Sequence, residues 1–158
     1  MAESAPEITT GISADPLDVA AAIGAASSQT AGGLGVFIGT VRVSAAAPDH
    51  GDRAVVRLEY EAHPSLAPRR LTEIAREAAA TWDLTKIVAF HRTGPCDLGE
   101  PTVVVCCAAA HRAAALDACR GMIEEIKLTL PIWKREVYAD GSSWLGAEGA
   151  EAVPEEAL

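Results

Sequence analysis

The chain changes from helix to strand within the stretch Lys127-Leu128-Thr129-Leu130-Pro131-Ile132-Trp133-Lys134-Arg135-Glu136. Upstream of this stretch, apolar residues recur at helical spacing, at Leu116, Cys119, Ile123, Ile126 and Leu130. This periodicity predicts a long helix from His111 to Leu128. Proline lacks the N–H group that a helix interior needs, so Pro131 ends the helix. The residues after it predict a short strand over 133–138.

Two of the chain's three lysines lie in this stretch, whereas the chain contains ten arginines. An arginine stays charged at any ordinary pH, but a lysine ammonium loses its proton more readily when it is buried or close to other cations. Lys127 and Lys134, beside Arg135, are therefore candidates for proton transfer or amine chemistry. The structural alternative is that Lys127 only complements the dipole at the end of a helix, which contributes about 0.3–1 kcal/mol.

The composition is that of one globular domain. The chain has 158 residues, of which 49% are hydrophobic and 22% are charged, enough to bury a core. A net charge of −9 argues against general nucleic-acid binding, which needs a basic surface. No run approaches the roughly 18 apolar residues of a membrane span, and the start of the chain lacks the charges of a signal peptide. We therefore expect a cytoplasmic protein that binds neither nucleic acid nor membrane.

The four cysteines follow no metal-binding or redox spacing; they are Cys96, Cys106, Cys107 and Cys119. Cys106 and Cys107 are neighbours in an apolar run, where successive side chains point to opposite faces of a strand. We expect all four to be buried as small hydrophobic residues, and we expect no metal site. A redox or sulfur-relay role for Cys96, which lies in a predicted loop, is the alternative.

Strands and helices follow one another without regular alternation, which predicts one α+β domain. The expected strands span 8–12, 34–43, 54–61, 86–93, 102–109, 133–138 and 143–145. The expected helices run from an Asp15-Pro16 start to Ala26, from near Pro68 to Trp82, and from His111 to Leu128. Segment 44–52 is expected to be an exposed, mobile loop. The domain is expected to cover 1–145, followed by a disordered acidic tail over 146–158.

Arginine and histidine side chains supply candidate anion ligands. Arg42 ends a strand in which a glycine lets a ligand or another backbone approach closely. His111 and Arg112 begin the long helix, where free N–H groups and the helix dipole favour a phosphate or carboxylate. Both positions are also ordinary for solvent-exposed residues. For the similar dipeptide His91-Arg92, before a glycine turn, we favour a structural role.

Five stretches of the sequence carry a family resemblance. They are Val36-Phe37-Ile38-Gly39-Thr40-Val41-Arg42, Leu58-Glu59-Tyr60-Glu61-Ala62, His91-Arg92-Thr93-Gly94, His111-Arg112, and Lys127 through Glu136, with Gly141 and Trp144 behind them. In this order they resemble the catalytic, large subunit of molybdopterin synthase, the MoaE family. The resemblance spans residues 8–144, and the combination of Gly-Thr-Val-Arg with Pro-Ile-Trp-Lys-Arg-Glu makes it specific.

The resemblance implies a sulfurtransferase of molybdenum cofactor biosynthesis, which converts cyclic pyranopterin monophosphate to molybdopterin. Sulfur would arrive as a thiocarboxylate on the C-terminal glycine of a small ubiquitin-like carrier subunit, and no metal or cofactor is implied. The family fold is an α/β hammerhead with an added α+β portion, which would combine a mixed or antiparallel sheet with the long helix. The large subunits of the family form a homodimer within a heterotetramer.

Carried over position by position, the family's site falls on nine residues of this chain. The catalytic pair is Lys127 and Lys134, and the substrate-binding residues are Thr40, Val41, Arg42, His111, Arg112, Arg135 and Glu136. The cations suit an anionic pterin phosphate. A lysine whose pKa is lowered by its neighbours can also act as acid and base near neutral pH. The alternative is a non-catalytic module that binds a pterin or a nucleotide phosphate and regulates a partner.

The predicted long helix separates two parts of this expected site. His111 and Lys127 are about sixteen residues apart, which is about 24 Å at a rise of about 1.5 Å per residue. One pterin monophosphate is too small to touch both ends of the helix. We therefore expect an obligate homodimer in which each pocket takes His111 and Arg112 from the second copy.

Overall fold

The computed structural model describes residues 5–44 and 53–147. In chain order its elements are β1 (Glu7–Ser13), α1 (Val19–Ala26), β2 (Gly33–Thr40), β3 (Val55–Ala62), α2 (Leu66–Thr81), β4 (Lys86–Arg92), β5 (Gly94–Asp97), β6 (Pro101–Ala109), α3 (Arg112–Thr129), β7 (Ile132–Tyr138) and β8 (Ser143–Ala147). Most of the expected loop, residues 45–52, and most of the expected tail, residues 148–158, lie outside the described residues.

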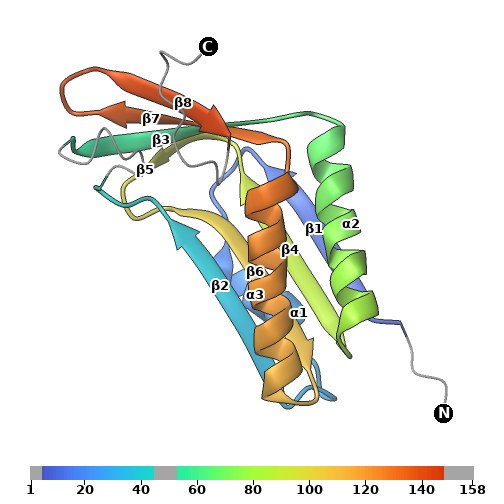
Figure 1. Ribbon diagram of the computed structural model, residues 1–158. Helices are drawn as coiled ribbons and strands as arrows, with labels where there is room; N and C mark the ends of the chain where they lie inside the picture. Colours follow the sequence, from blue (N-terminus) through green and yellow to red (C-terminus); the bar gives the residue numbers. More distant parts are fainter. Residues whose placement is uncertain (1–4, 45–52, 148–158) are drawn as a thin grey trace.

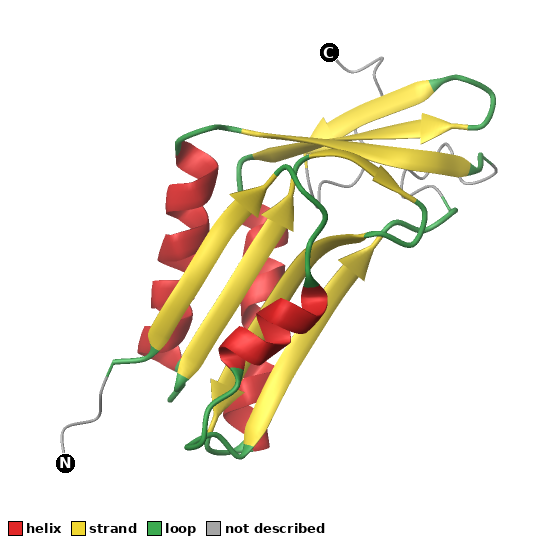
Figure 2. Cartoon of the chain, turned by 180° about the vertical axis from the view of Figure 1, so that it is seen from behind, coloured by secondary structure: helices red, strands yellow, loops and turns green. Residues whose placement is uncertain are grey.

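The strands form two four-stranded sheets (Figure 1). The first sheet has the order β1-β4-β6-β2, in which β1 runs parallel to β4 and the other pairs are antiparallel. The second sheet has the order β5-β3-β7-β8 and is antiparallel throughout. Helices α2 and α3 cover one face of the first sheet and α1 covers the other (Figure 2). The predicted α+β class, the mixed and antiparallel sheets and the long helix are confirmed.

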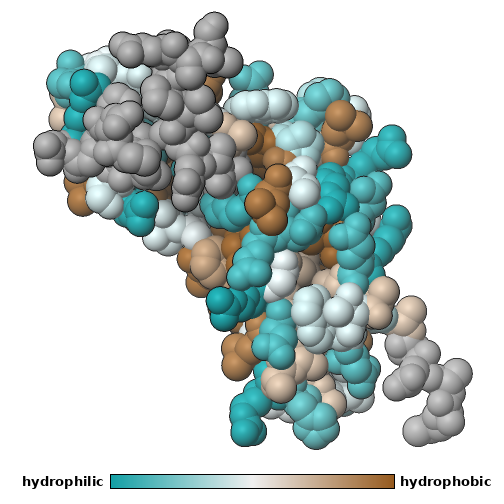
Figure 3. Space-filling view, in the orientation of Figure 1, coloured by the Kyte–Doolittle hydropathy of each residue, from teal (hydrophilic) through white to brown (hydrophobic). Residues whose placement is uncertain are grey.

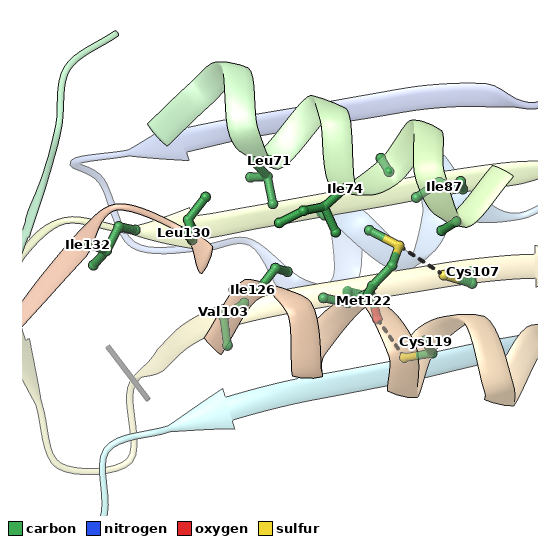
Figure 4. Packing of buried hydrophobic residues seen from close by; sticks show 14 of the residues in the cluster. Leu71, Ile74, Ile87, Val103, Cys107, Cys119, Met122, Ile126, Leu130 and Ile132 are labelled. Carbon is green, nitrogen blue, oxygen red and sulfur yellow. Dashed lines mark hydrogen bonds between the residues drawn. The ribbon is translucent and has the colours of Figure 1, made fainter. Parts of the chain in front are cut away.

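The larger core fills the space between α2, α3 and the first sheet and continues to the second sheet (Figure 4). Cys107 lies in this core against Met122, whereas Cys106 faces the smaller core under α1. All four cysteines are buried free thiols. Their expected role as small buried hydrophobic residues, with Cys106 and Cys107 on opposite faces, is confirmed.

Helix α1 begins at Val19, so the predicted start at Asp15-Pro16 is wrong. Asp18 is the N-cap, and its carboxylate accepts a hydrogen bond from the N–H of Ala21 at 2.9 Å. Upstream, the N–H of Asp15 donates to the Ser13 hydroxyl at 3.1 Å. Asp15 therefore belongs to a turn that precedes the helix, and the later Asp18 supplies the helix cap.

Three strand boundaries also differ from the prediction. Strand β2 ends at Thr40 rather than at residue 43, because its register against β6 shifts after Gly39. The predicted loop 94–99 contains β5, which pairs with β3. Strand β8 runs through Gly146 and Ala147, which we expected to begin the tail, because both pair with β7.

Contacts at both ends fix α3 against the rest of the fold. A Cβ atom at Gly35 of β2 would collide with the carbonyl oxygen of Ala115, so only glycine lets the helix lie this close to the strand. From α2, Arg70 donates to Glu125 at 2.8 Å and to Thr129 at 3.0 Å. Lys127 lies between Glu125 and Thr129 in the last two turns of α3.

Candidate active site

A pocket of about 310 Å³ lies where the ends of β2 and α3 meet the second sheet. Figure 1 shows both elements reaching this sheet at their C-terminal ends. The pocket is lined by Phe37, Ile38, Gly39, Thr40, Arg42, Ser44, Val55, Leu58, Tyr60, Thr102, Lys127, Lys134 and Glu136. Five of the nine site residues expected from the sequence are therefore brought together within one chain.

The polar residues of strand β7 lie on two opposite faces of the strand. Lys134 and Glu136 point into the pocket, opposite Tyr60 and Leu58 of β3. Arg135 lies between them in sequence and therefore points to the outer face. There it donates to the Ser143 hydroxyl at 3.2 Å and lies 3.8 Å from a carboxylate oxygen of Glu59.

The two lysines are electrostatically coupled. Burial, and then the charge of Lys134, lower the pKa of Lys127 from its ordinary value of 10.5 to about 8. Burial also lowers the pKa of Lys134; Glu136 opposes this effect, and Arg42 adds to it. A lysine with a pKa of about 8 exchanges protons readily near neutral pH, so Lys127 is suited to acid–base chemistry.

Glu136 is a buried carboxylate, with 2% of its surface exposed. The hydroxyl of Tyr138 donates to its Oε2 atom at 2.8 Å. This hydrogen bond holds the carboxylate on the wall of the pocket, where it favours the charged form of Lys134. Glu136 thus lies where its charge favours the neighbouring ammonium of Lys134.

Sequence reasoning assigned no role to two polar residues of the pocket wall, Tyr60 and Thr102. Their side chains are hydrogen bonded, and the Thr102 hydroxyl donates onward to the carbonyl oxygen of Gly39 at 3.3 Å. Burial raises the pKa of Tyr60 to about 12, so its hydroxyl stays protonated. The alternation of β3 could have placed Tyr60 on an inward face, but only the fold shows that this face lines the pocket.

The structure does not bring four of the expected site residues into this pocket. The side chain of Val41 is buried in the core, with 3% exposed. Arg135 lies on the outer face of β7, as described above. His111 and Arg112 are exposed and lie at the opposite end of α3, where a Cβ atom at Gly33 would be 3.2 Å from the Cα atom of Arg112.

Within residues 5–44 and 53–147, no group of three or more His, Cys, Asp or Glu side chains is arranged to hold a metal ion. No helix within them combines the length and the apolar character needed to cross a membrane.

Known proteins are similar to this chain in sequence and in fold. Residues 12–129 match the family of MoaE proteins. The molybdopterin synthase catalytic subunit of Oryza sativa subsp. indica is 43% identical over 128 residues, which cover 81% of this chain and 64% of the rice protein. This chain therefore spans less than two thirds of the rice protein's length.

Two further relatives are matched over most of their length. The molybdopterin synthase catalytic subunit of Bacillus subtilis is 38% identical over 135 residues, covering 85% of this chain and 83% of that protein. The X-ray crystal structure of molybdopterin synthase from Staphylococcus aureus has a TM-score of 0.75 at 28% identity, covering 91% of this chain and 98% of that one. The resemblance inferred from the sequence motifs is confirmed, and this chain belongs to the MoaE family.

Proposed function

We propose that this protein is the catalytic subunit of a molybdopterin synthase, a sulfurtransferase that converts cyclic pyranopterin monophosphate to molybdopterin. The observation that carries the proposal is the pocket in which Lys127 and Lys134 lie beside Arg42, with the pKa of Lys127 lowered to about 8. Family membership supports the same reaction. Four buried free thiols suit a reducing compartment, and we place the reaction in the cytoplasm.

The pocket supplies charge and proton transfer for this chemistry. Arg42 and Lys134 attract the anionic substrate, and the hydroxyl of Thr40 adds a neutral hydrogen-bonding group. The thiocarboxylate sulfur attacks a carbon of the pterin side chain, and an oxygen-containing group leaves from that carbon. Water then hydrolyses the acyl–sulfur bond, which leaves the sulfur on the pterin and a carboxylate on the carrier. Each step moves a proton, and Lys127 is the group whose pKa suits giving and taking it.

We further propose that the sulfur comes from a small ubiquitin-like carrier subunit. Its C-terminal glycine would carry the thiocarboxylate into the pocket. A chain end without side chains is thin enough to enter a pocket of about 310 Å³ together with part of the substrate. Neither Val41 nor Arg135 is included in this proposed site, because their side chains lie in the core and on the outer face of β7.

We propose that a second copy of this chain completes the pocket with His111 and Arg112. Strand β2 is an edge strand of the first sheet, and an edge strand offers free backbone groups for pairing. Its residues Val36, Phe37 and Ile38 are 37–38% exposed. Apolar surface is visible along the side of the molecule that β2 forms (Figure 3). These features suit an interface between two copies.

Two-fold pairing of β2 with itself explains how the second copy reaches the pocket. The strand begins at Gly33, beside Arg112, and ends at Thr40, on the pocket wall. In an antiparallel pair the start of one strand lies near the end of the other. The eight residues of β2 span about 26 Å, close to the length of α3 between Arg112 and Lys127. Each pocket would thus receive His111 and Arg112 of the other copy.

Mixing two inactive variants tests the shared site. Lys127→Ala and Arg112→Ala chains are each expected to be inactive, because each homodimer would lack one necessary group in both pockets. A mixed dimer has one pocket with both residues intact, so co-refolding the chains should restore up to about half of the activity per dimer. Mixed dimers that form but make no product would refute the shared site, as would an active monomer.

A further inference from the structure

His91, at the end of β4, is a buried histidine that the proposed reaction does not use. Its side chain is 1% exposed. Its Nδ1 atom lies 2.8 Å from the carbonyl oxygen of Arg92. Because a carbonyl can only accept, Nδ1 carries the ring hydrogen and Nε2 is left with a lone pair. Among the described residues, none donates a hydrogen bond to Nε2. Native structures rarely leave such an acceptor buried and unpaired.

The ring lies in the layer directly behind the pocket. It packs edge-to-face against Tyr60, with the ring centroids 5.1 Å apart and the planes at 74°. Tyr60 itself lines the pocket. Burial first, and then the charge of Lys127, lower the pKa of His91 to about 4, so the imidazole is neutral at any working pH. The neutral ring is therefore a fixed acceptor that packs on Tyr60, and Tyr60 and Lys127 line the same pocket.

Several charged or titratable groups from neighbouring elements face this region. They are Tyr60 of β3, Lys127 of α3, Lys134 and Glu136 of β7, Arg42 beyond β2, and Arg92 and Cys96 next to the β4–β5 turn. The strand partners of His91 in β1 and β6 are Ile12 and Val103, which carry no charge. Of the nearby cations, Lys127 is the one whose charge acts on His91.

We propose that His91 is a positioning residue whose Nε2 atom accepts a hydrogen bond from a water molecule that the Lys127 ammonium also contacts. The lysine is flexible and polar at its tip, and the imidazole is fixed by Arg92 and Tyr60. The water-mediated bond would hold the ammonium at one place in the pocket. Its effect on turnover rests on the proposed function, but the hydrogen bond itself does not.

The scarcity of lysine makes the bond measurable without any substrate. The chain contains only Lys86, Lys127 and Lys134, so biosynthetic labelling with ¹³C- and ¹⁵N-lysine gives three side-chain signals, which Lys→Arg variants assign. An acceptor stabilises the charged form of an amine. Its removal in His91→Phe, which keeps a planar ring, should lower the pKa of Lys127 by about one pH unit from its value of about 8.

Matched variants separate the acceptor from the bulk of the ring. His91→Gln retains a side-chain carbonyl and should leave the Lys127 titration within about 0.3 pH unit of the wild type. Thr10→Val removes a 2.8 Å hydrogen bond between β1 and α2 and should change no lysine signal. Lys86, which pairs with Glu7 at 3.3 Å, is the internal control. An unchanged Lys127 titration in His91→Phe, or an equal change in the Phe and Gln variants, would overturn the proposal.

Two further measurements keep the test decisive. If His91→Phe does not fold, the ¹⁵N signal of His91 Nε2 can be followed in the wild type and in Lys127→Met. A Nε2 signal that is the same in both would overturn the hydrogen bond. In the product assay, His91→Phe should lower kcat about tenfold and leave KM within about twofold. If the lysine responds as expected but the wild type forms no product, the hydrogen bond stands and the proposed function fails.

Discussion

Replacing Lys127 by methionine should stabilise the fold while removing the proposed catalytic amine. The pKa of Lys127 is about 8 instead of 10.5, mainly because the side chain is buried. At about 1.4 kcal/mol per pH unit, keeping the charged amine there costs the folded state about 3 kcal/mol. Methionine has a similar length and no charge. We expect a gain of about 1–2 kcal/mol at pH 7, because the ammonium also makes favourable contacts that the variant loses.

The pH dependence of this gain follows from the direction of the pKa change. Below pH 8 the amine is protonated in both the folded and the unfolded chain, so the full cost is present. Between about pH 8 and 10.5 the folded chain has lost the proton and the unfolded chain still binds it, so wild-type stability rises relative to the variant. The advantage of Lys127→Met should therefore shrink over this window.

Urea unfolding of the wild type and Lys127→Met at pH 7 and pH 10 measures both effects. The matched control is Lys86→Met, because Lys86 is a partly exposed lysine outside the pocket that pairs with Glu7. It should change the free energy of unfolding by no more than about 0.5 kcal/mol. The reasoning is refuted if Lys127→Met is less stable than the wild type at pH 7, or if its advantage is the same at both pH values.

Two other predictions test the geometry around the site. Gly35→Ala should lower the free energy of unfolding by about 1–3 kcal/mol, because the added methyl group meets the backbone of α3. The control Gly24→Ala places a methyl group in open space on α1 and should raise the free energy of unfolding by about 0.5–1 kcal/mol. Thermal unfolding compares the two variants, and equal effects would contradict the close approach of β2 and α3. Removing the C-terminal residues of the carrier should weaken its complex with this chain and abolish product formation, as measured by calorimetry and the product assay. An unchanged affinity and yield would exclude entry of the carrier's tail into the pocket.

The sequence predicted the elements that have strong local patterns. The long helix was found to within one residue at each end, because its apolar spacing and Pro131 are local signals. Strands β4 and β6 were predicted for the same reason. Strand β5 was missed, because its four residues contain a glycine and a proline and are held by pairing with β3. Such pairing depends on the tertiary fold and leaves little trace in the local sequence.

The structure gathers five of the nine expected site residues in one pocket, and the placement of the others has a physical cause. Lys127 and Lys134 stood out because lysine is rare in the chain, and the structure places both in one pocket. Arg135 was expected beside them, but the two-residue period of a strand turns it to the outer face. The role that we propose for His91 could not be predicted from the sequence, because it depends on a buried, unpaired nitrogen atom that only the packed structure shows.

The most direct test of the proposed function is whether the purified protein forms molybdopterin. Wild-type chain, cyclic pyranopterin monophosphate and thiocarboxylated carrier are incubated together, and the product is measured for the wild type and for Lys127→Arg. We predict that the wild type forms molybdopterin. The arginine variant should bind the carrier but form no product, because guanidinium keeps its proton at neutral pH. Near-wild-type turnover by Lys127→Arg would contradict acid–base catalysis by Lys127. A wild-type protein that binds the pterin substrate but forms no product would contradict the proposed enzyme and leave only a pterin-binding module.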